Sequence, residues 1–337
     1  MAERSFAREV EDLRLGDGDV FRGEGILAIT KALLQSGVSY VGGYPGSPIS
    51  HLIDVLGDAK DVLDELGVVF QSSANEAAAA AMLSASVMYP LRGAVAWKST
   101  VGTNVASDAL ANLASGGVTG GAMIIVGEDY GEGSSIMQER THAFAMKSQI
   151  WLLDPRPDHE CIVNMIEKGF ELSEASNTPV MLEVRIRACH VRGSFRAKNN
   201  RRPAMSLVEA LESPRRDTSR IVLPPASYTH EKEKIEKRWP AAVKFIQERR
   251  MNDVVPGDIG EIGIILQGGM YNGVMRALQG LGLADIWGTS RIPLYVLNVT
   301  YPLVPDEVAG FCRGKRAVLL VEEGQPDYIE QALSKIL

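Results

Sequence analysis

The sequence contains few cysteines and histidines, and neither residue type is spaced for binding a metal ion or a cluster. The three cysteines among 337 residues lie far apart, at Cys161, Cys189 and Cys312, so no Cys-x-x-Cys pattern occurs and a reducing compartment is indicated. The five histidines show no ligand spacing, and no His-Glu-x-x-His segment occurs. We therefore expect no metal site within this chain, and any redox centre must lie elsewhere.

Long apolar runs and an excess of positive charge are also missing. No apolar run reaches the length that spans a membrane, and the first residues mix charges without the apolar centre of a secretory signal. The formal net charge of −7 disfavours nucleic acid or an anionic membrane as a partner, and we interpret the arginines between 201 and 220 as a solvated linker. The composition thus predicts a cytoplasmic protein without nucleic-acid or membrane partners.

Glycine-rich nucleotide motifs are absent or stand in the wrong context. Gly23-Glu-Gly-Ile-Leu-Ala28 fits a dinucleotide fingerprint, but the run before it is polar and does not predict a strand. Gly16-Asp-Gly18 resembles the magnesium–diphosphate motif of thiamine enzymes but lacks the asparagine that completes it, so we interpret it as a turn. No Gly-Lys-Ser/Thr closes a glycine loop, which excludes a nucleoside-triphosphate site of that kind.

What the sequence does contain is a regular alternation of helical and strand-like segments. Helices are predicted at 24–35, 50–66, 75–88, 104–115, 136–147 and 158–174, and strands at 38–43, 67–70, 93–97, 121–127, 150–153 and 179–185. Such alternation indicates parallel strands joined by crossover helices. Residues 1–193 are therefore predicted to form an α/β domain with a doubly wound, mostly parallel sheet.

The remainder of the chain divides into a linker and a second, smaller α/β domain. Residues 194–257 are rich in Arg, Asn, Pro and Ser and contain one charged helix near 229–250. Alternation returns over 258–337, with strands at 261–266, 293–298 and 317–321, and helices at 271–282, 305–311 and from 328 onward. A length of 337 residues is suited to two such domains.

A proline-stiffened turn, Tyr44-Pro-Gly-Ser-Pro48, follows the first strand of the predicted sheet, and Ser73-Ala-Asn-Glu76 opens an alanine-rich helix. Such a turn marks the mouth of an open α/β sheet, where ligands usually bind, and a carboxylate held there can bond a ring nitrogen. This favours a heterocyclic cofactor. The alternative is structural, because Ser73 and Glu76 have the spacing of a capping box in which Glu76 bonds the Ser73 amide.

The chain as a whole resembles the α chain of indolepyruvate:ferredoxin oxidoreductases and, more distantly, pyruvate:ferredoxin oxidoreductases. The resemblance runs nearly end to end and is carried by short segments in matching order and spacing, at 43–48, 75–78, 98–108, 134–135, 170–173, 189–193, 261–266, 301–303 and 321–323. In this family the first domain binds the aminopyrimidine of thiamine diphosphate, and a domain similar to the transketolase C-terminal domain follows a linker. The predicted layout agrees.

The resemblance implies a role for Glu76 as the catalytic glutamate that bonds the pyrimidine nitrogen and thereby lets the cofactor activate itself. Carboxyl groups in apolar pockets can share a proton with such a nitrogen. Within the turn, Tyr44, Pro45 and Gly46 would contact the cofactor, and Ser47 stands where the pyruvate enzyme contacts its substrate. The missing side chain at Gly46 would widen the pocket for a larger oxo acid.

Four further residues are implied with less specific matches. Arg140 has the spacing of the arginine that grips the substrate carboxylate, although it could be an ordinary surface residue of a helix. Lys98, Thr103 and Asn104 lie on a strand-to-helix turn where they could line the cofactor cleft, and the alternative for Thr103 is helix capping.

The resemblance implies a reaction in which a 2-oxo acid is oxidatively decarboxylated to an acyl-CoA, with electrons passing through iron–sulfur clusters to ferredoxin. The part of the family that binds the cofactor's diphosphate through Mg²⁺, and the cysteine-rich part, have no counterpart here, so another segment or chain is expected to supply them and a dimer of such units is expected. Two alternatives stay open, namely a thiamine-dependent decarboxylase without redox chemistry and a noncatalytic scaffold.

Overall fold

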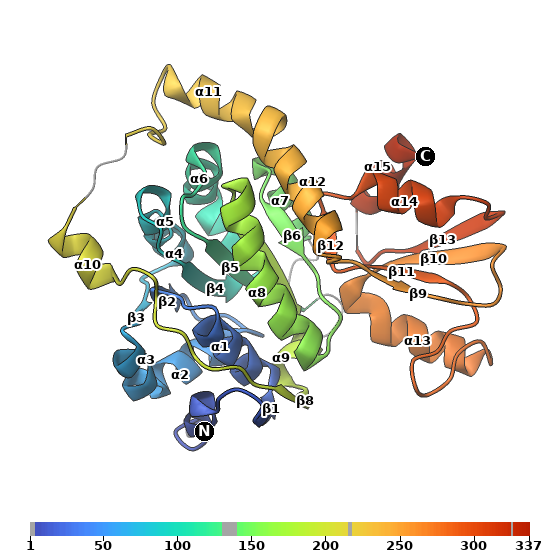
Figure 1. Ribbon diagram of the computed structural model, residues 1–337, viewed down its shortest axis with the longest axis horizontal. Coiled ribbons are helices and arrows are strands. Elements are labelled where there is room, and N and C mark those ends of the chain that lie inside the picture. The colour runs from blue at the N-terminus through green and yellow to red at the C-terminus, as the bar shows by residue number, and fades with distance from the viewer. Residues whose placement is uncertain (1–3, 130–139, 215–217, 325) are drawn as a thin grey trace.

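The computed structural model describes residues 4–129, 140–214, 218–324 and 326–337, and its main feature is a seven-stranded sheet (Figure 1). Six of its strands run parallel, and the edge strand β12 pairs antiparallel with β6. This confirms the predicted mostly parallel sheet. In spatial order the strands are β12 (Val299–Tyr301), β6 (Trp151–Leu153), β7 (Val180–Arg185), β5 (Ala122–Glu128), β4 (Gly93–Lys98), β2 (Tyr40–Gly43) and β3 (Val69–Ser72).

Helices cover both faces of this sheet, because successive residues of a strand point to opposite faces. In β5, Met123 and Ile125 belong to one apolar core, whereas Ile124 and Val126 belong to the other. The first core is covered by α1 (Gly25–Gln35), α2 (Ser50–Asp58), α3 (Lys60–Leu66) and α8 (His159–Ser176), and the second by α4 (Glu76–Met82), α5 (Ala85–Met88), α6 (Val101–Gly116) and α7 (Thr141–Ser148). The doubly wound prediction is confirmed.

A second, smaller α/β unit follows near the C-terminus, as predicted (Figure 1). Its four strands lie in the order β13 (Ala317–Val321), β10 (Ile262–Gln267), β11 (Leu294–Leu297) and β9 (Asp253–Val255). Helix α13 (Tyr271–Gly280), which follows the short turn η3 (Gly268–Met270), packs on one face, and α14 (Pro305–Cys312) and α15 (Tyr328–Ile336) pack on the other. β12 follows β11 in the chain yet joins the large sheet, and the exact domain boundaries at 193 and 257 stay predictions.

The predicted charged helix of the linker is a run of three consecutive elements, α11 (Ala226–Glu233), the π-turn η2 (Lys234–Arg238) and α12 (Trp239–Glu248). A buried arginine explains its position. The Arg238 guanidinium donates to the carbonyls of Ala114 and Gly116, at 3.0 and 3.1 Å, at the C-terminal end of α6. Cations are favoured there because the last carbonyls of a helix have no partner within it. The short helix α10 (Leu207–Glu212) precedes this run.

Several local predictions differ from the structure. The helices predicted at 50–66 and 75–88 are each broken in two, at Ala59 and at Leu83–Ser84. The pattern also missed β1 (Val20–Glu24) and β8 (Arg192–Arg196), which form an antiparallel pair, and the short helices η1 (Glu9–Arg14) and α9 (Ile186–His190). The helix predicted at 136–147 begins outside the described residues, which show α7 from Thr141. Within the described ranges, no helix is long and apolar enough to cross a membrane.

Candidate functional site

The strand order of the large sheet reverses beside β2. From β2 the chain crosses to the edge strand β3 and then returns past β2 to form β4 on the other side. Ligands of open α/β sheets bind outside the carboxyl ends of the strands at such a reversal. The segments that leave β2 and β4 at this edge are the turn that begins at Tyr44 and the residues Ser99 and Thr100.

The turn after β2 packs closely on β4. A Cβ added at Gly46 would lie 2.6 Å from the Cβ of Lys98, which explains why glycine is needed there. Tyr44, Pro45 and Ser47 are exposed beside it. The structure therefore brings the predicted residues of this turn and Lys98 together at the expected edge of the sheet.

Glu76 is the first residue of α4, and the structure gives it no capping role. The N-cap is Asn75, whose side chain accepts a hydrogen bond of 2.9 Å from the Ala78 amide. The capping box proposed for Ser73 and Glu76 is therefore wrong, because the helix begins two residues later than that interpretation requires. The Glu76 side chain has only 8% exposure, and its carboxylate has no hydrogen-bond or ion-pair partner among the described residues. Its oxygens are not among the fully buried side-chain atoms that have no partner, so they keep access from the cleft, where a donor on a ligand could reach them.

The wall beside Glu76 is formed by the first turn of α6. A Cβ at Gly102 would lie 3.0 Å from Glu76 Oε1 and 2.7 Å from Trp97 Cδ1, so only glycine leaves room for the carboxylate. Trp97 is fixed because its Nε1 donates to Thr103 Oγ1 at 3.1 Å. Thr103 is fully buried and lies within α6, so the alternative of a helix-capping role is wrong, and the predicted contact with the cofactor stays a prediction. Asn104 is exposed one residue further along.

The backbone that enters α6 is strained. Thr100, the N-cap, has φ 56° and ψ −79°, a conformation that β-branched residues rarely adopt, and it is 5% exposed. Strained residues of this kind concentrate at ligand sites. The strained residue lies two positions after Lys98, the last residue of β4, and directly before the first turn of α6, which faces Glu76.

Lys98 extends the site toward the neighbouring strand β5. Its Nζ lies 2.9 Å from Asp129 Oδ2, and both side chains are largely shielded from solvent. Glu128, which precedes Asp129 in the chain, accepts hydrogen bonds through Oε1 from Ser99 Oγ at 3.1 Å and from the Thr141 amide at 3.2 Å. Burial and the nearby Glu128 raise the pKa of Glu183 on β7 well above its usual range. Carboxyl groups therefore cluster at the ends of β5 and β7, which the sequence analysis did not single out.

Arg140 lies in a contact between the two units. Its guanidinium pairs with Glu322, donates to the carbonyl of Pro326 at 2.7 Å and packs over the Tyr328 ring, 5.4 Å from its centroid. The side chain is 3% exposed. The structure therefore does not bring Arg140 onto the open face of the turn, and the predicted contact with a substrate carboxylate stays a prediction.

A second buried contact joins the units around Asp154, the residue after β6. Asp154 accepts from Arg185 Nη2 at 2.9 Å and from the Gly269 amide at 3.1 Å, and Arg185 also pairs with Glu323. Burial raises the pKa of Asp154 to about 6, although Arg185 opposes this. The two units are thus held by buried polar contacts at the carboxyl ends of both sheets.

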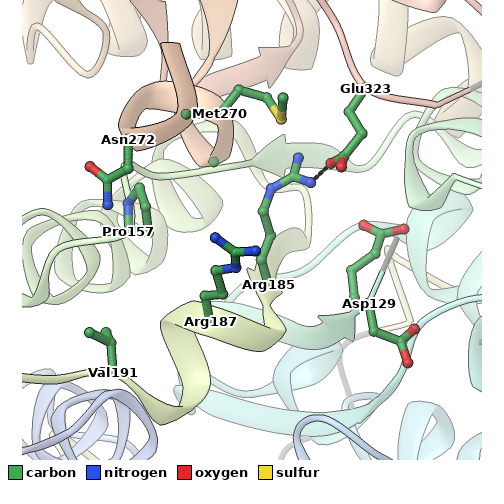
Figure 2. A pocket seen from close by; sticks show the side chains of 11 residues that line it. Asp129, Pro157, Arg185, Arg187, Val191, Met270, Asn272 and Glu323 are labelled. Carbon is green, nitrogen blue, oxygen red and sulfur yellow. Dashed lines mark ion pairs between the residues drawn. The ribbon is translucent and has the colours of Figure 1, made fainter. Parts of the chain in front are cut away.

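A cavity of about 330 Å³ opens between these contacts (Figure 2). From the large sheet and α9 the cavity is lined by Glu128, Asp129, Arg185 and Arg187, and from η3 and the first turn of α13 by Met270 and Asn272. Its position beside Asp129 connects it through Lys98 to the turn after β2. The only hint of this cavity in the sequence is that charged residues follow two strand-like runs.

Comparisons with known proteins agree with this fold. No protein-family model matches the chain. A solved 2-oxoglutarate:ferredoxin oxidoreductase from Magnetococcus marinus, with 2-oxoglutarate, coenzyme A and succinyl-CoA bound, is similar over 94% of this chain and 60% of that one, with a TM-score of 0.71 and 16% identity. The fold is therefore that of a 2-oxoacid oxidoreductase chain.

The sequence is related more specifically to the indolepyruvate oxidoreductase subunit IorA, which confirms the resemblance stated from the motifs. Identity is 30% over 321 residues with the subunit of Methanothermobacter thermautotrophicus, covering 94% of this chain and 49% of that one. With the subunit of Thermococcus kodakarensis it is 28% over 311 residues, covering 90% and 45%. The chain thus spans about half the length of the curated relatives it matches.

Proposed function

We propose that this chain provides the aminopyrimidine half of a thiamine diphosphate site in a 2-oxoacid:ferredoxin oxidoreductase of the indolepyruvate type. The observation that carries the proposal is Glu76, a residue only 8% exposed whose carboxylate has no partner among the described residues, at the reversal of the strand order. The relatives named above act on indolepyruvate or 2-oxoglutarate by their names, which supports an acid of that class as substrate.

Glu76 fits the aminopyrimidine by its chemistry. The carboxyl group can donate a proton to a ring nitrogen or accept one from it. Gly102 has no side chain, which keeps the space in front of Oε1 open. When bound, thiamine diphosphate would supply the carbon nucleophile and electron sink for decarboxylation of a 2-oxo acid. The buried Trp97 and Thr103 hold the wall opposite Glu76 in place, so the carboxylate is positioned before any ligand arrives.

The exposed rim of the cleft is apolar. Tyr44 is 36% exposed, and Val101 and Val105, one turn apart on α6, are 42% and 52% exposed. A surface of this kind supports the inference that a second polypeptide segment covers the cofactor. That segment would bind the diphosphate with Mg²⁺. The same segment or further partner chains would carry the iron–sulfur clusters and bind coenzyme A and ferredoxin.

The alternative is that the chain is a noncatalytic scaffold protein rather than part of an enzyme. In that case Glu76 would bind no ligand. The capping interpretation that would have explained Glu76 structurally is wrong. A buried acid that serves no partner costs stability, so a scaffold gives no reason to keep it.

The test is the reduction of a one-electron acceptor by the assembled enzyme with an aryl 2-oxo acid, coenzyme A and thiamine diphosphate. Glu76→Gln is expected to lower kcat by at least about a hundredfold, since proton exchange with the ring nitrogen is lost while the shape is kept. Glu160→Gln, a glutamate on α8 away from the cleft, is the matched control and is expected to retain activity. Wild-type activity in Glu76→Gln would support the scaffold instead.

A further inference from the structure

Strand β13 forms one edge of the smaller sheet, and no other described strand lies on its outer side (Figure 1). The neighbouring strand β10 shows which backbone groups of β13 are left open. The Ile264 amide donates to the Pro293 carbonyl at 3.0 Å, toward β11, so the residues on either side of Ile264 bond to β13. Leu319 lies opposite Ile264 and takes those bonds. Because backbone groups alternate in direction along a strand, the amides and carbonyls of Val318 and Leu320 point to the open side.

The side chains of β13 are entirely apolar, and one face of the strand is left uncovered. The run from Ala317 to Val321 contains no polar residue, a pattern typical of strands that are buried on both faces. Helix α13 covers this face over β10 and β11, yet Leu319 is 60% exposed. Ile262, on the same face of β10, is 37% exposed beside it. The open edge of β13 is therefore continuous with an apolar surface.

The other edge of the smaller sheet is protected against pairing. β9 has only three residues, begins with Asp253, which pairs with Arg156 at 2.8 Å, and is followed by Pro256. Short length, charge and proline are the devices that keep sheet edges from pairing with other chains. Over its five residues β13 has neither charge nor proline. It therefore has the properties of a strand that normally has a neighbour on both sides.

The carboxyl end of β13 leads to the contact between the two units. The next two residues are Glu322, which pairs with the buried Arg140, and Glu323, which pairs with Arg185. Arg185 also lines the cavity beside Asp129. A segment that lies along β13 therefore reaches the same edge of the molecule as the candidate site.

We propose that the open edge of β13 receives a strand of the polypeptide that carries the diphosphate half, so that this polypeptide docks by extending the smaller sheet. The inference rests on the proposed function for the identity of this partner. The matched part makes up only 49% of the Methanothermobacter thermautotrophicus subunit, so in that relative a similar length of polypeptide accompanies this pair of units. In strand addition, main-chain hydrogen bonds supply affinity, and side chains such as Leu319 supply specificity.

A second copy of this chain is the competing occupant. Two copies would pair their β13 strands antiparallel around Leu319, which sets Arg316 of one copy opposite Glu322 of the other. Glu322 is 7% exposed and already paired with Arg140, so it has little to offer a second cation. This disfavours the symmetric pair, and the experiment below detects it.

The first measurement is backbone hydrogen exchange, followed by mass spectrometry, in the 337-residue chain alone and in its assembly with the polypeptide that carries the diphosphate half. Exchange over β13 is expected to slow by at least about tenfold in the assembly, because the Val318 and Leu320 amides gain acceptors. Exchange over β9 is expected to stay unchanged. Unchanged exchange over β13 in the assembly would overturn the inference, as would protection in the chain alone that is lost on dilution, which indicates a second copy.

Two exposed substitutions on opposite edges provide a matched pair. Leu319→Lys is expected to weaken the association of the two polypeptides by at least about tenfold, because it places a charge at the new strand pair. Val254→Lys, at a residue of β9 that is 65% exposed, is expected to leave the association unchanged. Equal affinities for both variants would also overturn the inference, and equal unfolding midpoints in the chain alone would show that both fold.

Failure of this inference can be told apart from failure of the proposed function. An assembly whose turnover depends on Glu76 while β13 exchanges freely would refute only the docking of a strand. Turnover that does not depend on Glu76 would refute the proposed function, whatever the exchange over β13.

Discussion

Replacing Gly102 by alanine tests how closely the wall of the cleft is fitted to Glu76. The new Cβ would lie 2.7 Å from Trp97 Cδ1 and 3.0 Å from both Cγ and Oε1 of Glu76. Trp97 is fully buried and bonded to Thr103, so it cannot move aside. The Glu76 side chain is the neighbour that can give way, and we expect it to turn from its position.

The magnitude follows from two opposing effects. Alanine inside a helix is favoured over glycine by about 1 kcal/mol, whereas overpacking a closely fitted site costs about 1–3 kcal/mol. A net loss of about 1 kcal/mol in the free energy of unfolding is therefore expected. Gly310 in α14 is the matched control, because a Cβ there meets nothing within 4 Å, and Gly310→Ala is expected to gain up to about 1 kcal/mol.

The two variants can be compared by urea unfolding followed by tryptophan fluorescence, with an expected difference of about 2 kcal/mol between them. Thiamine diphosphate binding by the assembled enzyme should weaken in Gly102→Ala and stay unchanged in Gly310→Ala. The reasoning is refuted if Gly102→Ala is as stabilising as Gly310→Ala, since the space in front of Glu76 would then not be limiting.

Three other predictions concern buried charges. Lys31→Met should lower the free energy of unfolding by about 2 kcal/mol in urea, because the Leu15 carbonyl and the Asn200 amide oxygen lose their donor while the Leu13 carbonyl keeps only that from Asn200; no loss would show that water replaces the ammonium. Arg140→Met should cost about 3 kcal/mol by leaving the buried Glu322 carboxylate without its cation, with only the Ile329 and Glu330 amides as donors. Adding Glu322→Gln should recover part of this cost in thermal unfolding, and full additivity would contradict the pairing. Because the pKa of Asp154 is raised to about 6, this group stabilises the fold below pH 4, and the contribution is lost as the pH rises through 6. Asp154→Asn should therefore remove a fall of about 2 kcal/mol in the free energy of unfolding between pH 4 and pH 7, and an unchanged pH profile would refute the assignment.

Most of the fold could be predicted from periodicity because the parallel strands are buried on both faces. β4 and β5 are continuous apolar runs, and glycine or proline punctuates the chain around them. The pairing of β1 with β8 was missed because it joins segments on opposite sides of a whole domain. β12 was missed because it has only three residues and follows directly after β11, so it shows no alternation of its own in the sequence.

The site was predictable only in part. The turn at 44–48 and Glu76 were found because Pro, Gly and a carboxylate follow strands of the sheet, and the structure brings them to one edge. The error over the Ser73 cap arose because Asn75 offers an equally good cap two residues later. Glu128 was not found, since its neighbours Ser99 and Thr141 come from other elements and only the fold brings them together.

The most direct test of the account is the binding of thiamine diphosphate with Mg²⁺, measured by calorimetry on this chain together with the polypeptide that carries the diphosphate half. The account predicts saturable binding that is lost in Glu76→Ala, while the exposed Glu65→Ala keeps wild-type affinity. Binding that is equally tight in Glu76→Ala, or no binding by the wild-type assembly, would contradict the central claim that this buried carboxylate holds the cofactor.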